Sequence, residues 1–311
     1  MKAVVAKNIS KAYLVNKLPV TALQDISFEV EQGELFGLVG PDGAGKTTLF
    51  RLLTTLLIPD QGSLTVLGYD TVKNLKEIRN ISGYMPGRFS LYQDLTVKEN
   101  LEFFATIFNT SIEKNYELVK DIYSQIEPFN DRRAGKLSGG MKQKLALSCA
   151  LIHKPRILFL DEPTTGVDAV SRKEFWEMLR RLKAQGITIL VSTPYMDEAS
   201  LCDRVALIQE GKILALDKPD AINSRFGKRL WAIKAANMVP LLTALKEWPL
   251  VYSCFSFGEF YHVVFKGDTE TKESIEKYLF SKGFINVEVD SIQPNIEDTF
   301  MALMNNKNDN R

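Results

Sequence analysis

Short apolar runs alternate with amphipathic segments over the first two thirds of the chain. Residues 34–39, apolar after the first position, and residues 157–160 have strand length. A strand without polar alternation is typical of a sheet covered on both faces, as in a parallel sheet. Apolar positions recur at helical spacing in residues 47–53 and again in residues 140–153, which end before Pro155. The pattern predicts an α/β domain built on a mostly parallel sheet.

A helical insertion interrupts this α/β pattern. Residues 97–108 and 116–126 place apolar side chains at helical spacing, and Pro128 ends the second segment. Together with residues 140–153, these segments predict a helical subdomain over about residues 87–153.

The character of the sequence changes after Pro219. The expected order of strand, helix, strand, strand, helix, strand is that of a ferredoxin-like α+β domain. We therefore expect a first domain of residues 1–219, a C-terminal accessory domain of residues 220–305, and a flexible polar tail of residues 306–311. Without a catalytic constellation, the accessory domain fits an interaction, regulatory or dimer-stabilising role. Its expected strands are residues 229–234, 251–257, 260–265 and 285–289, and its helices are residues 239–248, 271–282 and 296–304.

A glycine-rich loop, called here the first phosphate cradle, joins the first apolar strand to the first helix. Glycines permit a left-handed backbone and close approach of an anion, so the loop amides and the helix dipole can bind phosphates. Lys46 adds positive charge near the outer phosphates, and Thr47 offers a hydroxyl to Mg²⁺. A plain glycine-rich turn is the alternative, but the pattern matches by chance in only about one chain in a hundred of this length. The nucleotide-binding residues assigned here are Gly40, Pro41, Asp42, Gly43, Ala44, Gly45, Lys46, Thr47 and Thr48.

Two acids follow the apolar run of residues 157–160. Open parallel sheets bind ligands at the carboxyl ends of their strands, so Asp161 and Glu162 should lie beside the glycine-rich loop. Asp161 would hold Mg²⁺ together with Thr47, because this ion takes few protein carboxylates and keeps several waters. Glu162 would accept a proton from the water that attacks the γ-phosphate, which makes Glu162 and Lys46 the catalytic candidates. An acidic pair after a strand is alternatively a solvated strand end, and the loop favours catalysis.

A second phosphate cradle opens the helix of residues 140–153. Ser138 can cap this helix, and Gly139 and Gly140 leave its first amides open to an anion. The same three residues also form an ordinary capped helix start. On this segment alone, the two interpretations have equal weight.

The two cradles together resemble the motifs of ABC ATPases. Residues 137–143 are similar to the signature motif of that family and lie at the customary distance before the acidic pair. Residues 81–86 and 91–101 resemble the segment that leads into the family's helical subdomain, and residues 166–169 resemble its D-loop. The resemblance covers about residues 2–219 and points to the drug-export branch typified by daunorubicin-resistance ATPases.

This resemblance implies a P-loop NTPase core with an antiparallel β edge, and it implies ATP and Mg²⁺ as cofactors. The family holds ATP between the first cradle of one subunit and the signature of another, so the partner is a second copy or a different ATP-binding subunit. Tyr13 lies where the family stacks an aromatic ring on adenine. The signature residues implied in contact with the other subunit's nucleotide are Ser138, Gly139, Gly140 and Gln143.

The sequence departs from the family pattern at two important positions. Gly87 replaces a glutamine that senses Mg²⁺ and the attacking water, and Pro194 replaces a histidine that contacts the γ-phosphate. Val167 and Ala169 are lesser departures, in the D-loop. Loss of one preorganised donor typically slows a reaction about 10²–10³-fold, whereas binding depends mainly on the loop amides, Lys46 and Mg²⁺. We expect normal MgATP binding and slow hydrolysis at this chain's own site, a combination that suits a heterodimer and leaves a homodimer possible.

Composition is consistent with a cytosolic protein that works with a membrane subunit. The 311 residues have a net charge of +1 with both signs interspersed, which provides no electrostatic surface for nucleic acid. The three cysteines show no metal-binding spacing and fit a reducing compartment. We expect no signal peptide, because charges interrupt residues 1–7, and no run of the ~18–20 apolar residues that span a bilayer. The expected location is cytoplasmic, bound peripherally to the inner face of the cell membrane through an ABC-type permease.

The resemblance also implies a contact site for that permease. In the family, a short permease helix enters a groove that maps here to Arg88, Phe89, Leu91 and Tyr92. Phe89 and Leu91 fit equally well as core residues of the helical subdomain.

Two functions remain open from the sequence. The leading one is an ATPase subunit of an export complex, in which closure of paired subunits moves the permease. The alternative is an ATP-gated regulatory subunit that binds ATP, barely hydrolyses it and completes the site of a partner ATPase. Gly87 and Pro194 favour the second function, and Glu162 favours the first. Soluble ABC proteins that act on ribosomes or DNA fit less well, because they usually have two cassettes in one chain.

Overall fold

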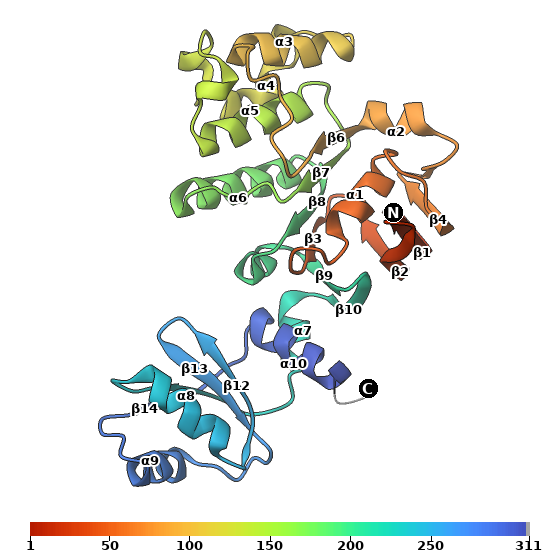
Figure 1. Ribbon diagram of the computed structural model, residues 1–311. Helices are drawn as coiled ribbons and strands as arrows, with labels where there is room; N and C mark the ends of the chain where they lie inside the picture. Colours follow the sequence, from red (N-terminus) through yellow and green to blue (C-terminus); the bar gives the residue numbers. More distant parts are fainter. Residues whose placement is uncertain (309–311) are drawn as a thin grey trace. The chain divides into compact units, whose positions relative to one another are not determined.

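The computed structural model of the chain describes residues 1–308, with the side chains of residues 1–305. The chain divides into two compact units, of which the first is residues 1–219 and the second begins at Asp220. Each unit combines β-sheet with helices (Figure 1).

The first unit, residues 1–219, is built on a six-stranded central sheet. Five strands run parallel in the order β9-β3-β8-β7-β6, and β10 pairs antiparallel with β9 at one edge. Every residue of β3, β7 and β8 is buried, as in strands covered on both faces. The predicted mostly parallel sheet is confirmed. Its strands are β3 (Leu35–Val39), β6 (Ser82–Met85), β7 (Ile157–Asp161), β8 (Thr188–Thr193), β9 (Arg204–Gln209) and β10 (Lys212–Asp217).

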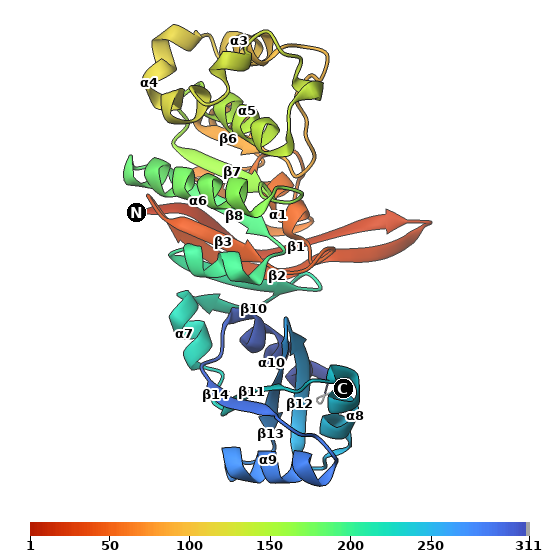
Figure 2. The same ribbon diagram turned by 90° about the vertical axis from the view of Figure 1, so that its left-hand side faces the viewer.

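An antiparallel sheet forms the second layer of this unit, with strand order β2-β1-β4-β5. Strands β1 (Lys2–Val15) and β2 (Leu18–Glu31) form a long hairpin (Figure 2). Strands β4 (Gln61–Val66) and β5 (Tyr69–Asp70) complete the sheet.

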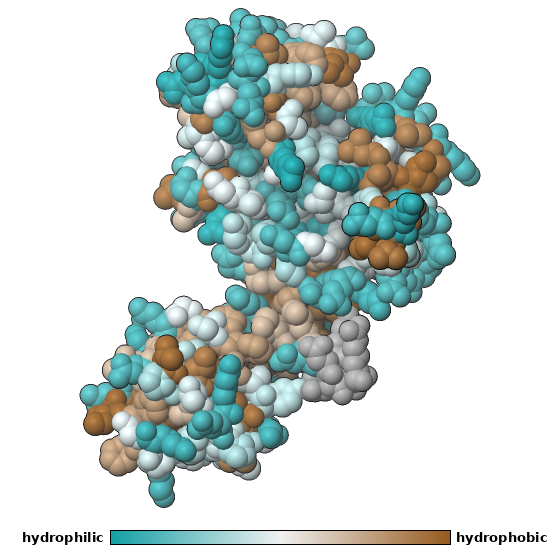
Figure 3. All heavy atoms as spheres, viewed as in Figure 1, coloured by the Kyte–Doolittle hydropathy of each residue, from teal (hydrophilic) through white to brown (hydrophobic). Residues whose placement is uncertain are grey.

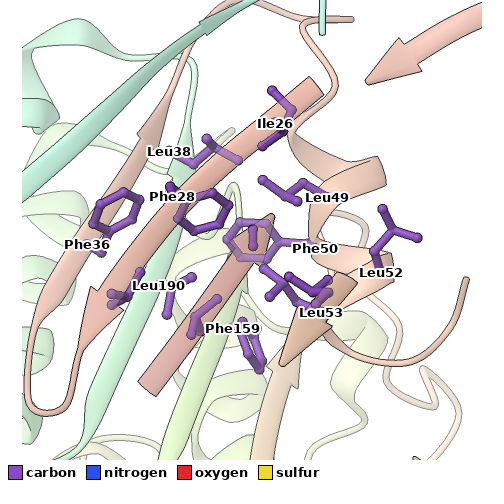
Figure 4. Close-up of a cluster of buried hydrophobic side chains, with 14 of the residues drawn as sticks. Ile26, Phe28, Phe36, Leu38, Leu49, Phe50, Leu52, Leu53, Phe159 and Leu190 are labelled. Carbon is purple, nitrogen blue, oxygen red and sulfur yellow. The ribbon is translucent and has the colours of Figure 1, made fainter. Parts of the chain in front are cut away.

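Helix α1 (Lys46–Leu53) packs between the two sheets of the first unit. Figure 4 shows its apolar side chains among residues from both layers. The ring of Phe50 meets the edge of Phe159 in β7 at a centroid distance of 6.2 Å, and Phe28 of β2 stacks on Phe36 of β3 at 5.6 Å. Because α1 is buried on more than one side, the core fixes the position of its first turn.

The helical insertion consists of α3 (Val97–Ile107), α4 (Ile112–Tyr123) and α5 (Gly139–Leu151) (Figure 1). Three helices were predicted here, but α4 begins four residues before the predicted segment 116–126, where Ser111 caps it, and ends three residues earlier. Helix α3 begins in a reciprocal capping box between Thr96 and Glu99. The remaining elements of the unit are α2 (Leu75–Ile81), α6 (Ala169–Ala184) and the 3₁₀ segments η1 (Glu127–Phe129), η2 (Ala134–Lys136) and η3 (Met196–Leu201).

The described part of the second unit has the expected ferredoxin-like order. After α7 (Pro219–Ser224), its four-stranded antiparallel sheet has the order β12-β13-β11-β14. Aromatic and aliphatic side chains of the sheet pack against α8 and α9. The elements are β11 (Leu230–Lys234), α8 (Met238–Glu247), β12 (Val251–Phe257), β13 (Phe260–Phe265), α9 (Lys272–Ser281), β14 (Glu288–Ile292) and α10 (Ile296–Asn308).

Two predictions for the second unit require correction. Strand β14 begins three residues later than predicted, because Ile285 is exposed and Asn286 adopts a positive φ of 57°. Helix α10 continues to Asn308, so the first three residues of the predicted flexible tail are helical. The rest of that tail, residues 309–311, lies outside the described residues.

Candidate functional site

The glycine-rich loop joins β3 to α1 in a conformation that its glycines require. A Cβ atom on Gly40 would lie 2.1 Å from the carbonyl oxygen of Ile208. Gly45 has a φ of 105°, and a Cβ there would lie 2.5 Å from the carbonyl oxygen of Ala22. Among the described residues, no side chain caps the N-terminus of α1. The loop therefore presents backbone amides at an uncapped helix N-terminus, an arrangement that binds phosphates.

Lys46 lies at the centre of this loop. Its side chain is 3% exposed, and its ammonium group donates hydrogen bonds to the carbonyl oxygens of Gly40 (2.7 Å) and Pro41 (2.9 Å). The same nitrogen lies 3.1 Å from Oε1 of Glu162, whose side chain is 21% exposed. The two residues predicted to be catalytic therefore form a direct ion pair.

The end of β7 holds both predicted acids close to β8. Asp161 is 1% exposed, and one of its carboxylate oxygens accepts a hydrogen bond of 2.6 Å from the hydroxyl of Ser192. The backbone amide of Glu162 lies 2.9 Å from that hydroxyl oxygen and 3.1 Å from the Ser192 carbonyl oxygen. Ser192 is not among the site residues predicted from the sequence. The available signal was a pair of hydroxyl residues, Ser192 and Thr193, at the end of an apolar strand.

The chemistry of these side chains fits a nucleotide with Mg²⁺. Thr47 stands in the first turn of α1 and Asp161 at the end of β7, and both offer the hard oxygen atoms that Mg²⁺ prefers. Within residues 1–305, no group of three or more His, Cys, Asp or Glu side chains could form a metal cage. Mg²⁺ does not need such a cage, since it binds through one or two carboxylates together with substrate phosphates.

Tyr13 lies next to the glycine-rich loop. It is on β1, and its hydroxyl is 3.3 Å from the hydroxyl oxygen of Thr48 in the first turn of α1. The fold therefore brings the predicted adenine-binding residue to the predicted phosphate-binding residues, although more than thirty positions separate Tyr13 and Thr48.

The second cradle lies apart from the first within this chain. Ser138 caps α5 by accepting a hydrogen bond of 3.4 Å from the amide of Met141. A Cβ atom on Gly139 would meet Gly166, in the loop after Glu162, and one on Gly140 would meet Ser171 of α6. Neither would meet a residue of the first cradle. Gln143 follows on the same helix. Ser138 and Gly139 are exposed, so this helix start is open to another molecule.

Comparison with known proteins agrees with this geometry. Residues 23–165 match the ABC transporter family. "Nod factor export ATP-binding protein I" of Rhizobium sp. (strain N33) is 37% identical over 292 residues, which cover 93% of this chain and 92% of that protein. The chain belongs to the ABC transporter ATP-binding proteins. "Probable multidrug ABC transporter ATP-binding protein YbhF" of Escherichia coli (strain K12) is 39% identical over 288 residues, or 91% of this chain. The match covers 49% of YbhF, so the chain spans about half the length of that relative.

Solved ABC cassettes share the fold of the first unit. The dimeric ATP-binding cassette MJ0796, in a post-hydrolysis state bound to ADP and Pi, aligns with a TM-score of 0.64 at 25% identity. That alignment covers 69% of this chain and 98% of the cassette. A structure described as the ATP binding subunit of an ABC transporter aligns with a TM-score of 0.65 at 28% identity, over 72% of this chain and 93% of that one.

Gly87 and Pro194, the two important departures from the ABC motif pattern, follow the carboxyl ends of β6 and β8. A Cβ atom on Gly87 would be 3.1 Å from the carbonyl oxygen of Asp161. Pro194 directly follows the buried end of β8, where the hydroxyl of Thr193 donates a hydrogen bond of 2.5 Å to Glu198. Neither glycine nor proline has a side-chain donor. Gly87 and Pro194 therefore place no side-chain donor at these two positions.

An apolar groove of about 430 Å³ lies between β6 and the helical insertion. Phe89, Leu91 and Gln143 line it, whereas Arg88 and Tyr92 of the predicted permease contact do not. Leu91 is nevertheless buried, so it belongs both to the groove wall and to the core of the insertion. Other residues of the wall include Leu56, Ile78, Tyr84, Met85, Phe104, Phe108 and His153.

Exposed apolar side chains continue beyond this groove. Figure 3 shows such side chains on the side of the first unit where α2 and β4 lie. Leu56, Ile58 and Val72 are the exposed aliphatic residues of that region. No helix within the described residues has both the length and the apolar character needed to cross a membrane.

His153 is a titratable residue of the groove wall. Its ring stacks on Phe108 at a centroid distance of 3.8 Å, and Nε2 lies 3.0 Å from the carbonyl oxygen of Ser82. Nδ1 is buried, with no hydrogen-bond partner among the described residues. Burial lowers the pKa of His153, and the hydrogen bond to Ser82 opposes this only in part.

A pH-dependent loss of stability follows. An unfolded histidine titrates near pH 6.5, so the stabilisation from neutral His153 is complete above that pH and is lost as the pH falls through the lower pKa of the folded state. His153→Gln should reduce the loss of stability on acidification. Native-state hydrogen exchange of the α5 amides, corrected for intrinsic rates, measures the stability of this region at each pH. An equal loss of stability on acidification in the variant and in the unmodified chain would show that His153 is not its cause.

Proposed function

We propose that this chain is the ATP-binding subunit of an export complex and couples MgATP binding and hydrolysis to a separate membrane permease. The observation that carries the proposal is the convergence of Lys46, Asp161 and Glu162 beside an uncapped helix N-terminus. The names of the relatives add the direction of transport, since they refer to multidrug transport and Nod factor export. The exported compound is left open, because a permease selects it.

Each residue of the first cradle has a role in this proposal. The loop amides and Lys46 bind the phosphates, and Tyr13 stacks on adenine. Thr47 and Asp161 hold Mg²⁺, which neutralises phosphate charge when bound. Glu162 accepts the proton of the attacking water.

Phosphate binding would also release the general base. Lys46 lies 3.1 Å from Glu162 and within hydrogen-bonding distance of two loop carbonyl oxygens. Triphosphate oxygens compete with Glu162 for the same ammonium group, because each is an anionic partner of one buried charge. We infer that Glu162 leaves Lys46 when the nucleotide enters and becomes available to the attacking water.

The second cradle serves another subunit in this proposal. Ser138, Gly139, Gly140 and Gln143 complete the site of a partner, either a second copy of this chain or a different ATP-binding subunit. Gly87 and Pro194 weaken cleavage at the chain's own site, whereas the signature keeps its capped helix and open amides. This difference favours a heterodimer in which the partner's site cleaves ATP faster.

The apolar groove is the proposed contact with the permease. Phe89 and Leu91 line a cavity of about 430 Å³ that suits the apolar face of a short helix. This contact would place the chain in the cytoplasm, at the inner face of the cell membrane. We assign the second unit to an accessory role, in regulation or in stabilising the subunit pair.

The alternative function is a regulatory subunit that binds ATP and barely hydrolyses it. The specific observation in its favour is Gly87, which offers no side chain at a position where the family pattern has a glutamine. This position is next to the predicted Mg²⁺ ligand, because a Cβ atom on Gly87 would be 3.1 Å from the carbonyl oxygen of Asp161. Both functions include MgATP binding and a partner subunit, so they differ in whether this chain's own site cleaves ATP.

Binding and cleavage should separate in the isolated chain. We expect MgATP affinity comparable to that of a relative with the histidine, and hydrolysis slower by about 10²–10³-fold for each missing donor. Pro194→His should raise the hydrolysis rate, while Pro194→Ala, which removes the proline without adding a donor, should not. Fluorescent-nucleotide titration and phosphate release provide the two measurements. Turnover equal to that of the histidine-containing relative would refute the expected impairment.

Glu162→Gln in the assembled complex distinguishes the leading function from the alternative. Cleavage is followed as loss of the γ-phosphate from the ATP bound to this chain, since a faster partner site would dominate the total rate. If this chain's site cleaves ATP, that loss should slow in the variant, because the amide cannot accept the proton of the attacking water. The matched control is Glu117→Gln, an exposed residue of α4 whose carboxylate contacts only Lys120 among the described ion pairs. An unchanged rate of γ-phosphate loss from this chain in the Glu162 variant would reject the leading function for this site and support the regulatory one.

A further inference from the structure

Strand pairing places Ser192 directly beside Asp161. Strands β7 and β8 are parallel neighbours, and the pairing register aligns these two residues. Ser192 is 0% exposed and Asp161 is 1% exposed, so neither side chain depends on water for its orientation. A buried hydroxyl must find partners within the protein, because an unsatisfied one costs about 1–3 kcal/mol.

The serine hydroxyl bridges the two predicted acids. The amide of Glu162 can only donate, so Ser192 Oγ accepts from it at 2.9 Å. The single hydroxyl proton is then available to the carboxylate of Asp161, at 2.6 Å. The direction of both hydrogen bonds follows from this chemistry.

The second hydrogen bond supports an unusual backbone conformation at Glu162. This residue has a φ of 51°, in the left-handed region that costs a residue other than glycine roughly 1–2 kcal/mol. Regular strand geometry would direct Asp161 and Glu162 to opposite faces of the sheet. The left-handed turn ends that alternation, and Glu162 lies 3.1 Å from Lys46. The Ser192 hydroxyl and carbonyl both accept from the amide at this turn.

We propose that Ser192 is a positioning residue for both acids of the nucleotide site. It orients the Asp161 carboxylate toward Mg²⁺ and holds the backbone turn that directs Glu162 to the phosphates. The inference rests on the proposed function of this site. The neighbouring hydroxyl of Thr193 does not share the role, because it donates to Glu198.

The test compares Ser192→Ala with a second buried serine. Ser148 of α5 is also 0% exposed, and its hydroxyl donates only to a carbonyl oxygen of its own helix, that of Lys144, at 2.8 Å. Ser148→Ala therefore removes a buried hydroxyl without touching the nucleotide site. Ser192→Thr retains the hydroxyl and is the conservative rescue.

The readout is the Mg²⁺ dependence of ATP binding, which requires no turnover. Binding of a fluorescent ATP analogue to the full chain is titrated with Mg²⁺ and repeated in excess EDTA. Removing a hydrogen-bond partner of a metal ligand typically weakens metal binding 10–100-fold. Ser192→Ala should raise the half-saturating Mg²⁺ concentration about 10-fold or more, and change the affinity in EDTA less than twofold. Ser192→Thr should restore the Mg²⁺ dependence, and Ser148→Ala should leave it unchanged.

Two results would overturn the proposal. The first is an unaltered Mg²⁺ dependence in Ser192→Ala, and the second is an equal shift in Ser148→Ala. If threonine is not tolerated at this buried position, the comparison of the two alanine variants still decides. Failure of the proposed function gives a different result, because the unmodified chain would then bind no nucleotide with or without Mg²⁺. That result would reject both the ATP-binding function and the positioning role of Ser192.

Discussion

The packing of α1 between two sheets is the constraint on which the nucleotide site depends. Leu49, Phe50, Leu52 and Leu53 are buried in a core that includes residues of both layers (Figure 4). Burial of a side chain of this size contributes about 1.5–3 kcal/mol, so moving the helix would disrupt two interfaces at once. The first turn of α1, and the glycine-rich loop before it, are therefore held at the carboxyl end of β3. Rigid support of this kind keeps the loop amides in position for phosphates.

Charge and hydrogen bonding within the chain connect nucleotide binding to catalysis. Lys46 pairs with Glu162, and Ser192 bonds both to the carboxylate of Asp161 and to the amide of Glu162. In our account, phosphates displace Glu162 from Lys46, so binding and release of the base are a single event. In the same account, the missing donors at Gly87 and Pro194 slow only the later step. Binding and cleavage would then differ greatly at one site, and the two cradles would have unequal roles.

The fold was predictable where the pattern had one interpretation. The apolar run of residues 157–160 in β7 and the helices of the insertion were predicted within a few residues, because burial on both faces and helical spacing leave clear periodicities. Strand β14 was misplaced by three residues, since Ile285 is apolar and yet 71% exposed. The loop and both acids were predicted from local motifs. Ser192 was not, because its partners are thirty and thirty-one residues away and only strand pairing brings them together.

The central claim is that this chain cleaves ATP slowly in its own cradle, and therefore still holds ATP when its signature has completed one turnover at the partner's site. The most direct measurement identifies the nucleotide bound to this chain in the assembled complex after one round of turnover. A photoreactive ATP carrying a label on the adenine and another on the γ-phosphate, cross-linked at that moment, distinguishes ATP from ADP on each polypeptide. The account predicts that this chain retains both labels. Loss of the γ-phosphate label from this chain, at the rate of overall turnover, would contradict it.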